Sequence, residues 1–178
     1  MDELEYAGNM NAKVNMGWTN TFRYKDFSLS FLIDAKFGGK VISMTEAALD
    51  GWGVSKRSGE ARDAGGITVD GVKFDADKYY RTTGNNNFNS PYAVENYVYD
   101  ATNIRLREVT FGYTFRNLLV QARNLTAAII GRNLFFFPLK TPRLDPDVSA
   151  GTGNGIQGVD MFALPTSRSF GLNLKLNF

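Results

Sequence analysis

Residues with the chemistry to catalyse a reaction are scarce in this chain. It contains no Cys and no His, which removes thiolate nucleophiles, Cys-ligated metals and the commonest general base and zinc ligand. Metal-assisted hydrolysis would therefore need carboxylates alone, and no two carboxylates stand at a recognisable catalytic spacing. We expect no enzyme activity, no catalytic residues and no cofactor.

The acidic pair Asp145 and Asp147 flanks Pro146. Carboxylate oxygens are ligands that calcium prefers, so a metal site is one interpretation of this motif. Two acids beside a proline more often form a turn. We expect a turn here and no bound metal.

Four aromatic residues fall within one long region that lacks strand periodicity. They are Trp52, Tyr79, Tyr80 and Tyr92. Loops often carry binding residues, and aromatic rings can stack on a ligand or meet a partner protein. Packing of the loop against itself is the alternative interpretation. We keep the four as candidate ligand-binding residues.

Composition favours an all-β protein. The chain has 178 residues, of which 43% are hydrophobic and 13% aromatic, with 18 glycines, so one domain or two small ones can bury a core. The net charge of +2 provides no broad field for binding nucleic acid. The acidic N-terminus lacks the plan of a signal peptide, and no run of about 18 apolar residues predicts a transmembrane helix.

Five long segments are predicted to be strands, because apolar and polar residues alternate along much of their length. They are Lys13–Tyr24, Phe27–Phe37, Tyr97–Phe115, Asn124–Phe136 and Arg168–Phe178. Only Lys25 and Asp26 separate the first two, which predicts a hairpin. In the third, the apolar parity changes near Arg107, which predicts either a β-bulge or a change of environment along the strand.

Between these strands lie two long loops. The first holds one predicted short helix at Ser43–Leu49, where Ser43 and Glu46 have the capping-box spacing, and a small hairpin at Ile67–Phe74 with Asp70-Gly71 at its turn. The stretch from Asp50 to about Glu95 is too long for an ordinary connection, which predicts a functional loop region. The second loop covers Pro138–Pro165.

Strand length, loop pattern and residue pattern together favour a transmembrane β-barrel. The predicted strands exceed the usual five or six residues, short and long connections alternate, and the apolar parity is aromatic near its ends. Outer-membrane barrels combine these properties. A soluble all-β module for carbohydrate binding or adhesion also alternates, and it remains the alternative.

Several segments resemble, in order, the C-terminal end of the SusC/RagA family of TonB-linked outer-membrane transporters of Bacteroidetes. They are NTFRYKDFSLSFLIDAKFGGKVISMTE (Asn20–Glu46), YDATNIRLREVTFGYTF (Tyr99–Phe115), IIGRNLFFF (Ile129–Phe137), LDPDVS (Leu144–Ser149) and LPTSRSFGLNLKLNF (Leu164–Phe178). The resemblance covers nearly the whole chain from about Gly8.

The resemblance implies a barrel of about 22 strands with an internal plug and a SusD-like lipoprotein as an external lid. It also implies energy from the TonB complex, acting through N-terminal parts, and oligosaccharide or peptide cargo. The expectation is that residues 1–178 form a single segment, the C-terminal part of such a barrel in the outer membrane. Signal peptide, plug and most of the barrel are then absent. The remaining implied partners are the lipid bilayer and the outer-membrane assembly machinery.

Within such a barrel, Arg105 and Arg107 are candidates for facing the lumen, where they would meet the plug or cargo. Pairing with neighbouring carboxylates in the barrel wall is the alternative. Phe178 is a candidate assembly signal, with a place in the aromatic girdle as its alternative. The residues expected to face lipid are Met16, Trp18, Phe22, Leu29, Phe31, Ile33, Phe111, Phe170, Leu172 and Leu174.

Overall fold

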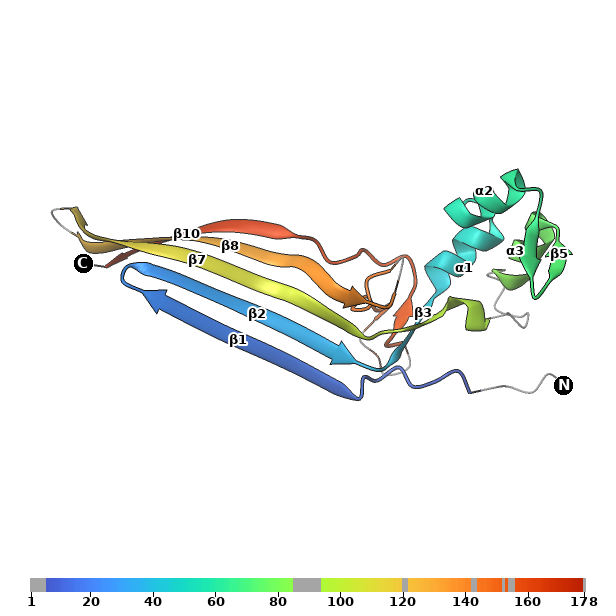
Figure 1. Cartoon of the computed structure of the whole chain (residues 1–178), viewed down its shortest axis with the longest axis horizontal. Coiled ribbons are helices and arrows are strands. Elements are labelled where there is room, and N and C mark those ends of the chain that lie inside the picture. The colour runs from blue at the N-terminus through green and yellow to red at the C-terminus, as the bar shows by residue number, and fades with distance from the viewer. Residues whose placement is uncertain are drawn as a thin grey trace. The chain divides into compact units, whose positions relative to one another are not determined.

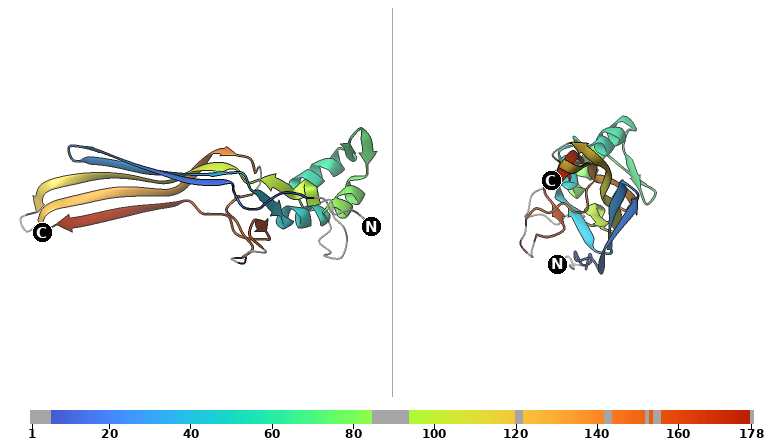
Figure 2. Two further views of the ribbon diagram at one scale, coloured as in Figure 1. Left: turned by 90° about the horizontal axis from the view of Figure 1, so that it is seen from below. Right: turned by 90° about the vertical axis from the view of Figure 1, so that its left-hand side faces the viewer.

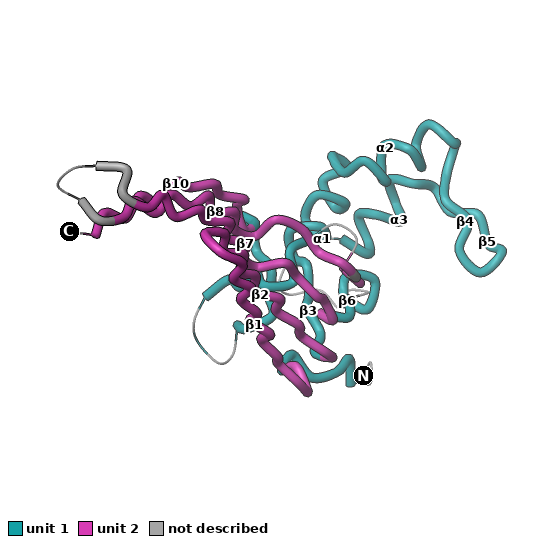
Figure 3. The backbone as a smooth tube through the Cα atoms, turned by 60° about the vertical axis from the view of Figure 1, so that its left-hand side comes forward, with its two compact units in different colours: residues 1–11, 39–100, 143–165 teal, residues 12–38, 101–142, 166–178 magenta. Residues whose placement is uncertain are grey.

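The computed structural model describes residues 6–84, 94–119, 122–141, 144–151, 153 and 156–177. The chain divides into two compact units (Figure 3). We call residues 12–38, 101–142 and 166–178 the sheet unit, and residues 1–11, 39–100 and 143–165 the loop unit. None of the helices in the described part of the chain has the length and apolar character that crossing a membrane requires.

The sheet unit is one five-stranded sheet with the order β1-β2-β7-β8-β10, in which every neighbouring pair is antiparallel (Figures 1 and 2). Its strands are β1 (Val14–Tyr24), β2 (Phe27–Phe37), β7 (Asn103–Leu119), β8 (Ala122–Leu139) and β10 (Ser169–Asn177). The predicted meander of long antiparallel strands is confirmed.

One face of this sheet is apolar across all five strands. A single row of paired residues runs Phe22, Leu29, Phe111, Ile129 and Leu172 from β1 to β10. The register places all ten residues predicted to share a face on this side of the sheet. Because side chains alternate between faces along a strand, the next residues along each strand lie on the opposite side.

The opposite face of the sheet carries polar residues and, in one region, residues with very small side chains. The adjacent row runs Arg23, Ser28, Gly112, Ala128 and Asn173. A Cβ atom on Gly112 would lie 2.7 Å from the Ser28 hydroxyl oxygen and 3.3 Å from the Ala128 Cβ. The close approach of these neighbours explains the glycine at that position.

Of the two interpretations of the parity change near Arg107, the structure shows the β-bulge. On β2, Leu32 pairs with Glu108 and the next residue, Ile33, pairs with Leu106, so Arg107 is the extra residue. The pairing of β7 with β8 shifts at the same point. The bulge returns Leu106 to the apolar face and so restores the pattern that the sequence appeared to break.

The two-residue turn Lys25–Asp26 closes the β1–β2 hairpin as predicted. Lys25 takes the left-handed conformation, with φ of 53°. The turn is also tied to β7, because the Arg116 Nε donates to the Asp26 carboxylate at 2.5 Å and the Thr114 N–H donates to the Asp26 carbonyl at 2.9 Å.

The loop unit combines short strands and helices. Its elements are β3 (Lys40–Ser43), α1 (Met44–Gly51), α2 (Lys56–Asp63), β4 (Ile67–Val69), β5 (Val72–Phe74), α3 (Ala76–Thr83), η1 (Val94–Tyr97), β6 (Val98–Asp100) and β9 (Val159–Asp160). They form a three-stranded sheet in the order β6-β3-β9, with β9 parallel to β3, and the separate hairpin β4-β5.

The predicted helix is α1, where the Ser43 hydroxyl accepts from the Glu46 N–H at 3.1 Å. The Ile67–Phe74 hairpin is also confirmed, with φ of 50° at Asp70 and 81° at Gly71. The expectation of one helix was incomplete, because α2 and α3 lie in the stretch that lacked periodicity. Ser55 and Asp75 cap these two helices.

Candidate functional site

A buried charged cluster organises the loop unit. The Arg57 guanidinium on α2 donates from Nε to the Asp50 carboxylate at 2.7 Å and forms an ion pair with it through Nη2. Its Nη1 lies 3.4 Å from the Glu46 carboxylate. Glu46 and Asp50 are four residues apart on α1 and therefore share one face of that helix.

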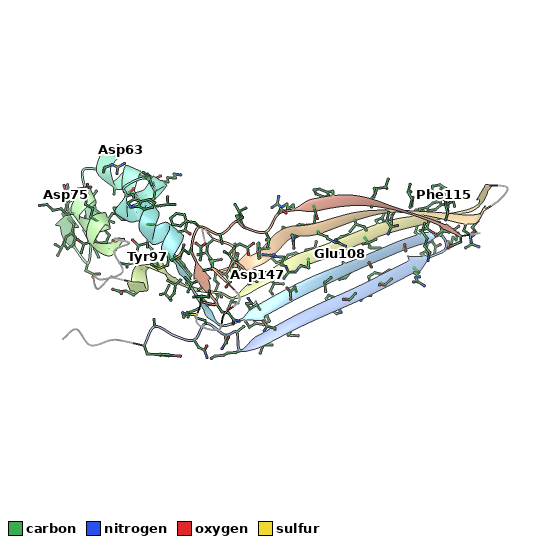
Figure 4. All side chains as sticks on the ribbon, turned by 180° about the vertical axis from the view of Figure 1, so that it is seen from behind. Asp63, Asp75, Tyr97, Glu108, Phe115 and Asp147 are labelled. Carbon is green, nitrogen blue, oxygen red and sulfur yellow. The ribbon has the colours of Figure 1, made fainter. Side chains whose placement is uncertain are left out.

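Two tyrosines complete this cluster. The Tyr97 hydroxyl, on the residue labelled in Figure 4, donates to Asp50 at 3.1 Å, and the Arg57 guanidinium lies 5.2 Å from the Tyr97 ring centroid. Tyr99 donates to Glu46. Asp50 is 0% exposed, and the Ser55 hydroxyl also donates to it, at 2.5 Å.

Burial changes the proton affinity of these groups. Burial, and next the hydrogen bond to Glu46, raises the pKa of Tyr99 to about 12. Burial and the charge of Asp50 raise the pKa of Tyr97 well above its usual value. For Arg57, burial acts to lower the pKa, but the hydrogen bond and charge of Asp50 outweigh it, so the guanidinium stays charged.

A pocket of about 140 Å³ adjoins the cluster. Its walls come from α1, α2, β4, α3 and η1, all within the loop unit. The residues that line it are Asp50, Arg57, Ile67, Tyr79, Tyr80, Thr83, Asn96 and Tyr97. Three tyrosine rings, a hydroxyl, an amide and an ion pair therefore meet in one small space.

The structure places the predicted ligand-binding aromatic residues in different surroundings. Tyr79 and Tyr80 line the pocket, with their ring centroids 5.2 Å apart. Trp52 is not among the lining residues: it is 57% exposed, and its ring stacks on Phe162 at a centroid distance of 6.0 Å. Tyr92 lies outside the described residues.

Sequence reasoning missed Thr83, Asn96 and Tyr97 as pocket residues. Asn96 and Tyr97 follow a stretch without periodicity, and Tyr97 had been placed at the start of a strand. One available signal was the spacing of Glu46 and Asp50. Asp50 follows the predicted helix Ser43–Leu49 directly, and a helix one residue longer puts the two acids on one face, which calls for a basic partner.

The two candidate lumen arginines have different surroundings on the sheet unit. Arg105 is opposite Asp34 in the register and is buried, with its guanidinium 4.1 Å from the Phe136 ring centroid. Arg107, at the bulge, forms an ion pair with Asp34. Pairing of Arg107 with a carboxylate of the neighbouring strand agrees with the wall-structure alternative.

A second ion pair on the same face joins the Arg132 Nε to the Glu108 carboxylate at 2.8 Å. Glu108 is labelled on β7 in Figure 4. Arg132 and Glu108 are directly opposite each other in the register. The polar face of the sheet therefore carries ion pairs that join neighbouring strands.

The acidic motif forms a turn, as expected. The Asp145 carboxylate accepts from the Asp147 N–H at 3.0 Å, and the Asp145 carbonyl accepts from the Val148 N–H at 3.1 Å. An Asp side chain that bonds the backbone two residues on is the usual Asx-turn. Phe178, the candidate assembly signal, lies outside the described residues.

Comparison with known proteins finds a relative by sequence and a solved structure with a similar fold. No protein-family model matches the chain. TonB-dependent receptor P3 of Formosa agariphila is 25% identical over 189 aligned residues, which cover 99% of this chain and 17% of the receptor. A chain in the structure of the RagAB peptide importer in its open-open state matches with a TM-score of 0.68 and 18% identity, over 96% of this chain and 18% of that one.

The antiparallel strands match the barrel fold of TonB-dependent receptors. Together with the sequence likeness, this match confirms the resemblance predicted from the sequence, to a segment of a SusC/RagA-type TonB-dependent transporter. The chain spans less than a fifth of the length of the relatives that it matches.

Proposed function

We propose that the chain is the C-terminal part of an outer-membrane barrel that imports a nutrient with energy from the TonB complex. In this proposal, residues 1–178 form a single segment that supplies barrel wall and external loops. The sheet unit would supply the wall, and the loop unit would supply the external loops. The N-terminal parts that contact TonB, the plug and most of the barrel precede the segment.

The observation that carries this proposal is the two-sided sheet. Its apolar face runs unbroken across five strands and is highly exposed, with Phe170 at 76% and Leu172 at 69%. Lipid is the solvent that fits such a face, while the polar face suits a water-filled interior. The short connections follow β1 and β7, and the long ones follow β2 and β8, as in barrels with short periplasmic turns.

The finer parts of the proposal concern cargo and partners. The RagAB structure, which is similar in fold, is named as that of a peptide importer, which supports peptide cargo. Oligosaccharide cargo and a SusD-like lipoprotein as the lid are what the family resemblance implies. Transport relatives and the lack of His and Cys support a protein without enzyme activity. Arg105 and Arg107 would then face the lumen.

The alternative is a soluble all-β module, which would need a second layer over the apolar face. The other strands in the described part of the chain have two to four residues, too short to cover strands of 9 to 18 residues. Expression with and without detergent separates the two proposals. The barrel segment should need detergent to stay dispersed, and the soluble module should not.

A matched pair of substitutions tests the assignment of faces. Leu172 and Asn173 are adjacent on β10 and belong to opposite faces. In the full-length protein, Leu172→Arg should cost about 2–4 kcal/mol of folding free energy in lipid vesicles if the residue lies near the midplane, and Asn173→Arg should cost much less. Equal costs at the two positions would reject the lipid-facing assignment.

A further inference from the structure

We propose that Asp70 is a site of spontaneous modification, at which the main chain is rerouted through the aspartate side chain to give isoaspartate. The reaction needs no membrane and no partner, so the proposal stands apart from the transport function. The chain contains two Asp-Gly dipeptides, Asp50-Gly51 and Asp70-Gly71. The fold protects the first from this reaction and leaves the second open to it.

The reaction needs only the chain and water. The backbone nitrogen of the glycine attacks Cγ of the preceding aspartic acid, so that a new N–Cγ bond forms and the carboxyl hydroxyl leaves as water with the proton of the nitrogen. Water then opens the five-membered succinimide ring at either carbonyl carbon. Cleavage of the N–Cγ bond restores aspartate, whereas cleavage of the bond from the nitrogen to the main-chain carbonyl carbon leaves the chain running through Cβ and Cγ. Glycine favours the attack because it has no Cβ to crowd its nitrogen.

At Asp70 the fold leaves both reacting groups accessible. Asp70 and Gly71 form the two-residue turn between β4 and β5, with φ of 50° and 81°, and both residues are exposed. A Cβ atom built on Gly71 would meet no atom within 4 Å, so open space surrounds the glycine. Among the described residues, none accepts a hydrogen bond from the Gly71 N–H and none holds the Asp70 carboxylate in a hydrogen bond or ion pair.

The hairpin around this turn is short enough to open. β4 and β5 have three residues each and form a separate two-stranded sheet at the edge of the loop unit (Figure 3), and an isolated two-stranded hairpin is marginally stable in water. All three residues of β5 are exposed, with Val72 at 55% and Phe74 at 42%. Attack on Cγ requires the Asp70 backbone to rotate away from the turn geometry. Such local opening takes little free energy where few apolar contacts are broken.

At Asp50 the same dipeptide is held in place. Gly51 is the last residue of α1, and in a helix the backbone N–H groups donate to carbonyls four residues back. The Asp50 carboxylate is 0% exposed and accepts from Arg57, Ser55 and Tyr97. The glycine nitrogen cannot approach Cγ while these bonds hold, so reaction at Asp50 requires the buried cluster to open.

Isomerisation at Asp70 should also alter the surroundings of the turn. Isoaspartate adds one atom to the main chain, so the two-residue turn no longer matches the twist of its flanking strands. Ile67, at the start of β4, lines the pocket, and the Phe74 ring centroid lies 5.9 Å from that of Tyr79. A change in the hairpin therefore reaches one wall of the pocket.

The experiment follows heavy oxygen from water into the two dipeptides. The purified chain in detergent micelles is incubated in mildly acidic water enriched in heavy oxygen, then digested in ordinary water, and its peptides are analysed by mass spectrometry. Each passage through the succinimide adds one heavy oxygen atom. We expect labelling at Asp70 to be about tenfold faster than at Asp50 or more, a ratio that corresponds to ~1.4 kcal/mol in the free energy of local opening. Electron-transfer fragmentation should identify isoaspartate at residue 70.

The matched control is the same chain unfolded in guanidinium chloride. There the two dipeptides are equally exposed, so the ratio of their labelling rates should fall to near one. Far-ultraviolet circular dichroism checks that the first sample is folded and the second is not. In Asp70→Glu the added methylene would require a larger ring that forms more slowly, so labelling at residue 70 should be lost while the charge is kept.

Three results would overturn the inference. The first is no labelling at Asp70 in the folded chain, and the second is equal labelling of Asp50 and Asp70 there. The third is a ratio that stays the same on unfolding, since the neighbouring residue types and not the fold would then set the difference. None of these outcomes bears on whether Leu172 faces lipid, so failure here and failure of the proposed function are distinguishable.

Discussion

At the scale of single residues, Arg57 is the group on which the loop unit most depends. The helix that carries it, α2, has the sequence KRSGEARD, and its one buried residue is Ser58. With so little apolar surface to bury, α2 must be held by polar contacts. The contacts of Arg57 with Asp50 and Glu46 on α1 are the strongest of these.

Arg57→Gln should therefore loosen the loop unit. Removing one partner of a buried ion pair leaves the other charge buried and unpaired, which costs about 3–5 kcal/mol. We expect about 3 kcal/mol here, since the Arg57 side chain keeps 23% exposure while Asp50 has none. Hydrogen exchange of the α1 amides measures the loss. The control is Arg62→Gln, which removes an exposed bond to the Gly53 carbonyl; equal protection in the two variants would contradict the prediction.

Tyr99 should make the folded state of the loop unit less stable at high pH. Its pKa is raised from 10.0 to about 12, by burial and then by the bond to Glu46. The folded state therefore holds a proton that the unfolded state releases near pH 10, and the stability that Tyr99 contributes is lost as pH rises from 10 to 12. Absorbance at 295 nm should show a late tyrosinate step that Tyr99→Phe reduces. A titration unchanged by Tyr99→Phe would show that Tyr99 does not carry the shift.

The sequence could indicate which residue types can bind a ligand, but not which of those residues line the pocket. Aromatic character singled out Tyr79 and Tyr80, which do meet at the pocket, but the same criterion chose Trp52, which does not line it. The packing of α3 and η1 against α1 determines which residues line the pocket. These contacts join residues nearly fifty positions apart in the sequence, as in the hydrogen bond from Tyr97 to Asp50. No short-range pattern encodes such a contact.

At the scale of elements, the bulge at Arg107 keeps the two halves of β7 in phase with the sheet. Because Arg107 is the extra residue relative to β2, deleting it should leave Leu106 and Val109 on the apolar face. One loss is the Arg107–Asp34 ion pair, whose side chains are 33% and 40% exposed, which should cost about 1 kcal/mol or less. The deletion also removes a residue from the already irregular pairing with β8.

The matched control for this deletion is an alanine inserted after Phe111, which shifts half the strand by one residue and turns its side chains to the wrong face. Heat-modifiable mobility of the full-length protein on gels measures the folded fraction of both variants. The deletion should fold nearly as well as the parent, and the insertion should fold poorly. If both fold poorly, the bulge has a role beyond phasing.

The strands were predictable because alternation over many residues is a strong signal, and β2 has the predicted bounds, Phe27–Phe37. The helices α2 and α3 were not predicted. The first has almost no apolar residues to reveal a helical period, and the second, ADKYYRTT, spans only eight residues. Their caps, Ser55 and Asp75, lay within a polar stretch in which many residues could cap a helix.

At the scale of the whole molecule, the sheet unit has two outer strands, β1 and β10. Each has a neighbour on one side only within the described residues, and an open edge invites pairing with another strand. In a closed barrel these edges pair with strands outside the segment. We propose that assembly machinery recognises the C-terminal edge strand by adding a strand to its edge, as in β-augmentation.

Deleting Phe178 tests that recognition. The prediction applies to a full-length polypeptide that ends at Phe178, and it rests on the unbroken alternation of Phe170, Leu172, Leu174 and Leu176 on β10. If Phe178 served the aromatic girdle alone, its loss would cost about 1.5–3 kcal/mol of free energy from burying its side chain. That is a small fraction of the stability of a full-length barrel. We expect instead a large drop in the heat-resistant, folded fraction in outer membranes, with unaided refolding in detergent little changed. A near-normal folded fraction in cells would remove the recognition role, since a burial effect would act equally in cells and in detergent.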